Sequence, residues 1–299
     1  MAKGAISALT DEQLADYETL GFLHSIPILS PAEVCKYRTQ TEATCKAIGD
    51  HVTRLDQAHL FFRWAWELST HPRLLDFMEQ LLGPNILLKS TRLFYKYGRS
   101  ASYVGWHQDG ITEKLEDAQV PAVWLGLTAA TVANGCLRVA PGSHRLGLVP
   151  HVNRPDADNL TTQGLTAEAR IESPYDVTMS AGEMSLHHPL ILHSSNPNRS
   201  AEPRIGFTAT YCTASLPASR TAVAWVRGDG PRDRFEIIDR PPYTSLEDAV
   251  AAYRARDHQI LFGTSDQEAC HAENPPQPAT RQLGTSVTHK TNLDALTSY

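Results

Sequence analysis

The chain has 299 residues, of which 41% are hydrophobic and 20% charged, with a formal net charge of -6. This composition is ordinary for a soluble globular protein that can bury a substantial core. The mild charge and the lack of a long basic run argue against nucleic acid as a partner. No apolar stretch approaches the length of a membrane span, and the N-terminus lacks a signal-peptide pattern. We therefore expect a cytoplasmic protein without a membrane partner.

The first third of the chain predicts helices. Thr10 with Gln13 is typical of a capping box at a helix start, and Ser30-Pro31 repeats the start signal for a helix to about Ile48. Residues 57–68 are rich in aromatic side chains and predict one buried helix. Residues 72–82 carry an apolar face and predict another, which ends at Gly83.

After residue 84 the pattern changes to short strands. Residues 86–97, 103–109 and 122–128 predict strands, and Asn134-Gly135 predicts a hairpin turn before the strand that begins at Cys136. The polar stretch 150–173 predicts a long surface loop of the kind that covers an active site. Five scattered cysteines without a C-x-x-C pair favour reduced thiols.

Many short strands behind N-terminal helices predict a mainly β fold, a jelly roll or double-stranded β-helix of the cupin type. We expect a single domain over residues 1–263. It would comprise a helical part at 10–83, a jelly-roll core at about 84–215, and a C-terminal extension with a helix to 263. Residues 264–299 are rich in Pro, Ser and Thr and predict a flexible tail.

The stretch around His107 carries the first chemical signal. In an extended strand His107 and Asp109 point to the same side, while Gln108 is turned away. An imidazole and a carboxylate are two thirds of the 2-His-1-carboxylate triad that holds iron(II). His193, on a later strand, is the best candidate for the third ligand. His187 and His188 compete for that position, and we expect them to be structural.

Arg204 follows His193 by eleven residues and opens an apolar strand. A guanidinium group near a metal suits a bidentate grip on a carboxylate. Gly206 and Thr208 share the strand face of Arg204, and their small side chains would leave room for a ligand. Arg92 could face the same cavity and bind an anionic part of the substrate, or it could face solvent.

Several motifs together resemble the phytanoyl-CoA dioxygenase family of iron(II)/2-oxoglutarate oxygenases across roughly residues 10–215. They are His107-Gln108-Asp109, Asn134-Gly135-Cys136-Leu137, Pro141-Gly142-Ser143-His144, and His193 with Arg204 at the family's spacing. The resemblance implies a double-stranded β-helix wrapped by N-terminal helices.

The resemblance also implies roles for single residues. His107, Asp109 and His193 would bind iron, and Arg204 with Ser195 would hold the distal carboxylate of 2-oxoglutarate. Gln108 and Trp124 would line the cosubstrate pocket, with a purely structural core residue as the alternative reading of Trp124. His59 is the nearest candidate for the polar group that the family often places near the cosubstrate. Asp109 disfavours the halogenase subgroup, in which alanine or glycine replaces this carboxylate.

These residues predict an iron(II)- and 2-oxoglutarate-dependent dioxygenase that uses O₂. We expect it to hydroxylate a C–H bond of a small-molecule metabolite while 2-oxoglutarate is decarboxylated to succinate. Desaturation, ring formation and epoxidation are alternatives within the same chemistry. A cupin-like enzyme with a different metal and no 2-oxo acid, and a non-enzymatic jelly-roll binding protein, are the alternatives outside it. The substrate and the oligomeric state stay open.

Overall fold

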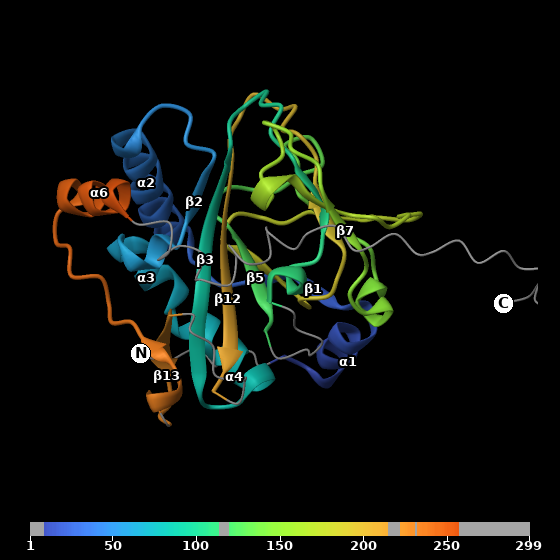
Figure 1. Cartoon of the computed structure of the whole chain (residues 1–299), viewed down its shortest axis with the longest axis horizontal. Coiled ribbons are helices and arrows are strands. Elements are labelled where there is room, and N and C mark those ends of the chain that lie inside the picture. The colour runs from blue at the N-terminus through green and yellow to red at the C-terminus, as the bar shows by residue number, and fades with distance from the viewer. Residues whose placement is uncertain (1–8, 114–119, 215–221, 231, 257–299) are drawn as a thin grey trace, which may run out of the picture.

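The computed structural model describes residues 9–113, 120–214, 222–230 and 232–256. Two β-sheets face each other, and helices pack against the outer face of the larger one (Figure 1). The arrangement is the predicted jelly roll. Among the described residues no helix is both long and apolar enough to cross a bilayer.

The helices fall mostly at the front of the chain, and four short 3-10 turns accompany them: α1 (Asp11–Leu20), α2 (Pro31–Ile48), η1 (Ala58–Leu60), α3 (Arg63–Ser69), α4 (Pro72–Leu82), α5 (Gly110–Glu113), η2 (Ser143–Leu146), η3 (Thr162–Gly164), η4 (Arg232–Arg234) and α6 (Leu246–Ala255).

The strands are short except for two: β1 (Phe22–Pro27), β2 (Arg54–Asp56), β3 (Ile86–Lys96), β4 (Val104–His107), β5 (Ala122–Gly126), β6 (Leu137–Val139), β7 (His151–Asn153), β8 (Leu165–Ala167), β9 (Tyr175–Val177), β10 (Glu183–His187), β11 (His193–Ser195), β12 (Arg204–Thr213), β13 (Ala222–Arg227) and β14 (Glu236–Ile237). The large sheet runs β1-β10-β5-β12-β3-β13-β14, with β2 paired to β3. The small sheet runs β4-β11-β6-β9, and β7 pairs with β8.

The predicted helix starts are confirmed. The side chains of Thr10 and Ser30 each accept a hydrogen bond from the backbone amide three residues on. In return, the side chains of Gln13 and Glu33 accept from the backbone amides of Thr10 and Ser30, which completes two capping boxes. The single helix predicted over 57–68 is wrong. Gln57 adopts a left-handed conformation and Phe62 an extended one, so the segment divides into η1 and α3.

Strand β12 shows how the large sheet serves two purposes. Successive side chains point to opposite faces, so Ile205, Phe207 and Tyr211 face the helices. There Phe207 meets the ring of Trp64 edge-on at 5.9 Å, and the Tyr211 hydroxyl donates to the carbonyl oxygen of Ser69 at 2.7 Å. The alternate residues of β12 face the small sheet and line the space between the two sheets.

A second apolar cluster fills the rest of that space. Phe22 and Trp124 from the large sheet pack with Leu137, Val139 and Val177 from the small sheet. The two sheets are therefore held together by these side chains, and a cavity lies beside the cluster, with Trp124 and Leu137 belonging to both.

Two loop predictions need correction. Asn134-Gly135 forms a turn, with the Asn134 side-chain oxygen accepting from the Thr131 amide, but it does not join a hairpin. Strand β5, before the turn, belongs to the large sheet, and β6, after it, to the small one. Residues 150–173 are not a plain loop either, since they contain the β7–β8 pair and η3.

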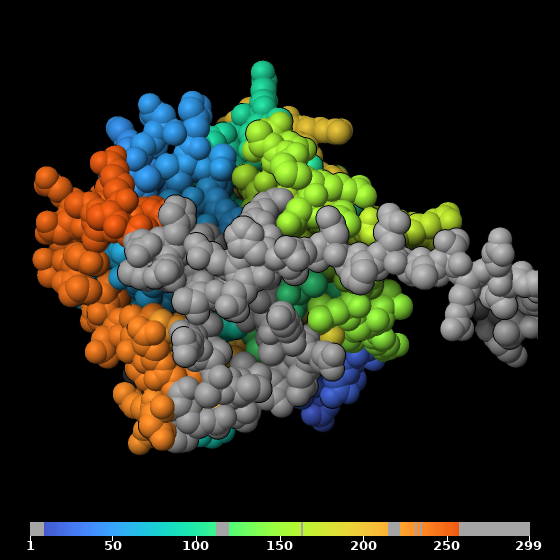
Figure 2. Space-filling model, viewed as in Figure 1, coloured from blue at the N-terminus to red at the C-terminus, as the bar shows by residue number. Residues whose placement is uncertain are grey.

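The predicted C-terminal helix is present as α6, which ends at Ala255. It lies beside α2 on the surface (Figure 2), and the Arg254 guanidinium donates to the carbonyl oxygens of Ala47 and Ile48. The rest of this prediction, to residue 263, and the predicted tail lie outside the described residues. The four cysteines within the described residues are free thiols, as expected.

Candidate metal and cosubstrate site

The three predicted metal ligands come together at one point in the small sheet. His107 ends β4, His193 begins β11, and the two residues are direct partners in the antiparallel register. Asp109 lies two residues beyond the end of β4, so strand alternation alone does not place it. Its Oδ1 atom lies 3.6 Å from His107 Nε2 and 3.8 Å from His193 Nε2.

The donor set fits a metal ion. The three ligand atoms lie within 4.8 Å of one another. Two atoms that each lie about 2.1 Å from one ion are separated by about 3 to 4 Å, depending on the angle between them. The contraction needed here is therefore small. Two neutral imidazoles and a carboxylate that leave positions open are the ligands of non-haem iron(II) oxygenases.

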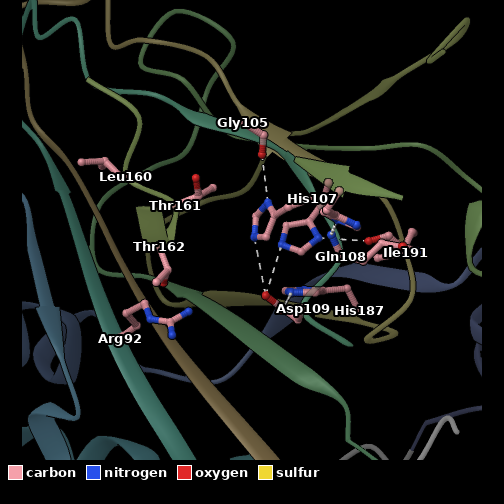
Figure 3. A network of polar contacts seen from close by, with 12 residues as sticks. Arg92, Gly105, His107, Gln108, Asp109, Leu160, Thr161, Thr162, His187 and Ile191 are labelled. Carbon is pink, nitrogen blue, oxygen red and sulfur yellow. Dashed lines mark hydrogen bonds and ion pairs between the residues drawn. The ribbon is translucent and has the colours of Figure 1, made fainter. Parts of the chain in front are cut away.

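Backbone carbonyl groups determine which nitrogen of each imidazole is free to bind a metal. The Nδ1–H of His107 donates to the carbonyl oxygen of Gly105 at 2.9 Å (Figure 3). His193 makes the same bond to Ile191 at 3.1 Å. Because a carbonyl oxygen can only accept, each bond fixes the proton on Nδ1 and leaves Nε2 bare for a metal. Burial, with His107 nearby, lowers the pKa of His193 to about 3.

Asp109 is surrounded by three imidazoles, not two. His187, on β10 of the opposite sheet, places Nε2 3.6 Å from Asp109 Oδ2 (Figure 3). Burial alone would raise the pKa of Asp109. His193, followed by His107 and His187, outweighs burial and holds that pKa well below its usual range. His187 was expected to be purely structural, but it lines the cavity. His188 does not, and its Nδ1 accepts from the Leu190 amide.

A cavity that is partly open to solvent lies between the triad and the large sheet. Opposite the metal ligands its wall is formed by Ser90, Arg92, Phe94, Trp124, Thr208 and Thr210. The register explains this wall, since Arg92 pairs with Thr208 and Ser90 with Thr210 across β3 and β12.

Arg204 lies at one end of the cavity and is 2% exposed. Its Nη2 donates to Ser195 Oγ at 3.5 Å, and its guanidinium carbon lies 5.2 Å from the centre of the Trp124 ring. Its Nε is buried without a hydrogen-bond partner among the described residues. Burial lowers the pKa of Arg204 to about 10, so the group remains a cation at neutral pH. A buried cation with an unused donor fits a carboxylate ligand.

Gly206 does not leave room for a ligand in the way that the sequence suggested. A Cβ at this position would lie 2.1 Å from Cζ2 of Trp124. The glycine is therefore needed because the indole lies directly over the backbone of β12. Trp124 is both a core residue and part of the cavity wall.

Gln108 is not in the cavity wall. It is fully buried, and its Nε2 donates to the carbonyl oxygens of Gly147 at 2.8 Å and Leu190 at 2.6 Å. Its Oε1 accepts from the Val149 amide at 2.9 Å. The side chain therefore ties β4 to two loops, and the expected role at the cosubstrate is wrong.

His59 is also away from the cavity. It is buried beside Thr91, with 3.0 Å between Nδ1 and the hydroxyl oxygen, on the helix-facing side of β3. The basic group near Arg204 is instead Lys96, which the sequence analysis missed. It is the last residue of β3, directly opposite Arg204. The alternation Ser90-Arg92-Phe94, continued by one step, would have found it.

Arg92 faces the cavity, which answers the question that the sequence left open. Its Nε donates to Asp56 Oδ1 at 2.7 Å. The same carboxylate accepts from Arg54, which also donates to the carbonyl oxygen of Leu160 at 2.7 Å and to the Thr162 hydroxyl at 3.2 Å. Two arginines around one carboxylate leave a net positive charge at this end of the cavity.

A double-stranded β-helix with a His-x-Asp…His centre is the fold and the site of the non-haem iron oxygenases. Comparison with known proteins agrees. Residues 17–206 match the family model described as phytanoyl-CoA dioxygenase (PhyH). The chain therefore belongs to the phytanoyl-CoA dioxygenase family, whose members depend on iron(II) and 2-oxoglutarate.

Individual relatives are distant. An ectoine dioxygenase from Nocardia farcinica is 28% identical over 222 residues, which cover 64% of this chain and 74% of the relative. The peroxisomal phytanoyl-CoA dioxygenase of Homo sapiens is 25% identical over 240 residues, 70% of each chain. A solved structure of the non-haem monooxygenase ThoJ superposes with a TM-score of 0.70 at 28% identity. That match covers 85% of this chain and 98% of ThoJ.

Proposed function

We propose that the enzyme hydroxylates a C–H bond of a small polar molecule while it converts 2-oxoglutarate to succinate. The observation that carries this proposal is Arg204, a buried cation with an unused donor in the same cavity as the His107–Asp109–His193 triad. A dicarboxylate bound at both places would be fixed at two points.

In this proposal each residue has one task. His107, Asp109 and His193 hold iron(II), and Arg204 with Ser195 holds the distal carboxylate of 2-oxoglutarate. The indole of Trp124 covers the Arg204 guanidinium and keeps water from that contact. Bound iron with 2-oxoglutarate and O₂ supplies the oxidising power for the C–H bond, and the protein supplies position and a dry site.

The other side of the cavity is proposed to receive the substrate. The hydroxyl groups of Ser90, Thr208 and Thr210 and the guanidinium of Arg92 form a polar wall. Of the guanidinium nitrogens of Arg92, only Nε has a hydrogen-bond partner among the described residues, the carboxylate of Asp56. Its remaining donors suit an anionic or oxygen-rich group. The relatives named for ectoine and phytanoyl-CoA act on small molecules, which supports a substrate of that class.

The test compares Arg204→Ala and Arg204→Lys for the 2-oxoglutarate KM and for iron affinity. Truncating one partner of a buried charge pair costs on the order of 2–5 kcal/mol, so the KM should rise roughly 30-fold or more in the alanine variant. The lysine variant should fall between, because an ammonium group cannot reproduce the two-pronged contact. Iron affinity should stay nearly constant. Arg63→Ala, at an exposed arginine of α3, is the matched control.

An unaltered 2-oxoglutarate KM in Arg204→Ala would remove Arg204 from the site. The reaction type is tested by the product from a metabolite panel screened for coupled succinate release. Hydroxylation adds one oxygen atom to the substrate, whereas desaturation or ring formation removes two hydrogens. Arg92→Ala should lower turnover of an anionic substrate without changing the 2-oxoglutarate KM.

A further inference from the structure

Lys96 is the least expected residue of the site. It is fully buried, and Arg204 stands directly opposite on β12. Neither basic group has an ion-pair partner among the described residues, since no carboxylate there lies within reach of either. Like charges at directly opposed positions of a sheet repel each other. Two buried basic groups therefore lie side by side where Arg204 borders the cavity, and no carboxylate of the described residues pairs with either of them.

The hydrogen bonds of Lys96 match a neutral amine. Its Nζ donates to Ser195 Oγ at 2.7 Å and to the carbonyl oxygen of Asn196. These are its two hydrogen-bond partners in the described structure, and a neutral amine has two N–H groups. An ammonium group has three, and the third would be buried without an acceptor.

Few groups can influence the charge of Lys96. From β12 the facing charge is Arg204, which disfavours a second cation. From the turn before β6 it is the thiol of Cys136, whose pKa burial raises to about 11, so the thiol stays neutral. From β11 and the residues after it the neighbours are Ser195 and Asn196, which carry no charge. Burial first, and Arg204 second, lower the pKa of Lys96 to about 5.

We propose that Lys96 is a neutral amine in the enzyme without cosubstrate and takes up a proton from solvent when the distal carboxylate of 2-oxoglutarate binds beside Arg204. The inference rests on the proposed role of Arg204. The incoming carboxylate supplies the missing negative charge, so the protonated form becomes favourable. Lys96 then acts as a second cation for the cosubstrate that is charged only in the complex.

The sign of the pH dependence follows from this linkage. Binding that takes up a proton weakens as the pH rises, so the Kd for 2-oxoglutarate should increase by up to about tenfold per pH unit. The window begins near pH 5, where free Lys96 titrates. It ends at the higher pKa of Lys96 in the complex. Below the window Lys96 is protonated in both states, and above it Lys96 is neutral in both.

The experiment is calorimetry of 2-oxoglutarate binding to the Ni(II)-loaded protein at pH 7.5, in buffers with different heats of ionisation. The dependence of the binding heat on the buffer gives the number of protons taken up. We expect about one proton for 2-oxoglutarate. Pyruvate can chelate the metal in the same way but has no distal carboxylate, and it should take up close to none. This contrast needs no variant.

Lys96→Met keeps the length of the side chain and removes the amine. It should abolish the proton uptake, flatten the pH dependence of the Kd and weaken 2-oxoglutarate binding about tenfold at pH 7. Lys36→Met, at an exposed lysine of α2 paired with Glu67, is the control and should behave as the wild type.

Three results would overturn the proposal. They are equal proton uptake with 2-oxoglutarate and pyruvate, binding of 2-oxoglutarate without proton uptake, and uptake that persists in Lys96→Met. A protein that does not bind 2-oxoglutarate at all would overturn the cosubstrate assignment itself. Binding without proton uptake would remove only the role of Lys96, so the two failures are distinguishable.

Discussion

His107 and His193 face each other directly across the antiparallel pair β4–β11, with their ring centres 4.1 Å apart. Both direct Nδ1 to the carbonyl oxygen two residues earlier in the chain. The register of two short strands therefore sets both the distance between the imidazoles and the nitrogen that each presents. A slip of one residue would turn one of them out of the site.

Three histidines on or near β10 and β11, namely His187, His188 and His193, should differ in a graded way when each is replaced by alanine. His193→Ala removes a metal ligand and should abolish tight metal binding. His187→Ala removes a neighbour of the carboxylate and should weaken binding by about 10- to 100-fold, as for other groups that orient ligands. His188→Ala should leave it unchanged. Calorimetric titration with Ni(II) measures all three, and equal losses for His187→Ala and His193→Ala would show that our third ligand is misassigned.

Gln108 should matter for stability and not for the cosubstrate. Gln108→Ala leaves one buried carbonyl oxygen, of Leu190, and two partly buried groups, the carbonyl oxygen of Gly147 and the amide of Val149, without their partner. The free energy of unfolding should fall by about 2 kcal/mol or more, because each unsatisfied buried group costs about 1–3 kcal/mol. Urea denaturation gives this value. If the 2-oxoglutarate KM of the folded variant rose strongly while stability stayed constant, Gln108 would belong to the cosubstrate pocket after all.

The contact between Gly206 and Trp124 can be tested with a compensating pair. Gly206→Ala places a methyl group against the indole, which should lower stability by about 1–3 kcal/mol and raise the 2-oxoglutarate KM as the ring moves from Arg204. In a Trp124→Leu background, the same Gly206→Ala change should lower stability much less, because the indole is no longer there. Thermal unfolding of the four proteins forms a double-mutant cycle. Strict additivity would mean that the two residues do not interact.

Arg54 should restrain local opening of the segment that follows β7. It joins Asp56 to the backbone of Leu160 and the hydroxyl of Thr162. In Arg54→Ala we expect faster amide hydrogen exchange over residues 159–167, because local opening loses two of its restraints. Exchange in α2 serves as the internal control. Unchanged exchange over 159–167 would mean that the neighbouring contact from Gly105 to Asn159 suffices to hold the segment.

Features that depend on nearby or characteristically spaced residue types could be predicted from the sequence. The helix starts at Thr10 and Ser30 are marked by residue types that lie within three positions of each other. The triad is marked by its residue types and their spacing: His107, Asp109 and His193. The Asn134-Gly135 turn shows the limit of such signals. Its residues predict a turn, but they do not determine that the next strand joins the other sheet.

Side chains whose partners lie far away in sequence could not be assigned. Gln108 bonds backbone groups of residues 147, 149 and 190, which have no side-chain signature. The need for Gly206 comes from Trp124 on a neighbouring strand. The role of Lys96 depends on its register with Arg204, which only the paired strands β3 and β12 define.

We propose that iron(II) and 2-oxoglutarate bind together between the His107–Asp109–His193 triad and Arg204. The most direct test is an anaerobic titration of the protein with Fe(II) and then 2-oxoglutarate, followed by visible absorption. We predict that the weak band of the iron–2-oxoglutarate chelate appears only when both are present, is lost in His193→Ala, and in Arg204→Ala requires much higher 2-oxoglutarate. Absence of the band in the wild-type protein, or its persistence at full strength in His193→Ala, would show that iron(II) and 2-oxoglutarate do not bind at this triad.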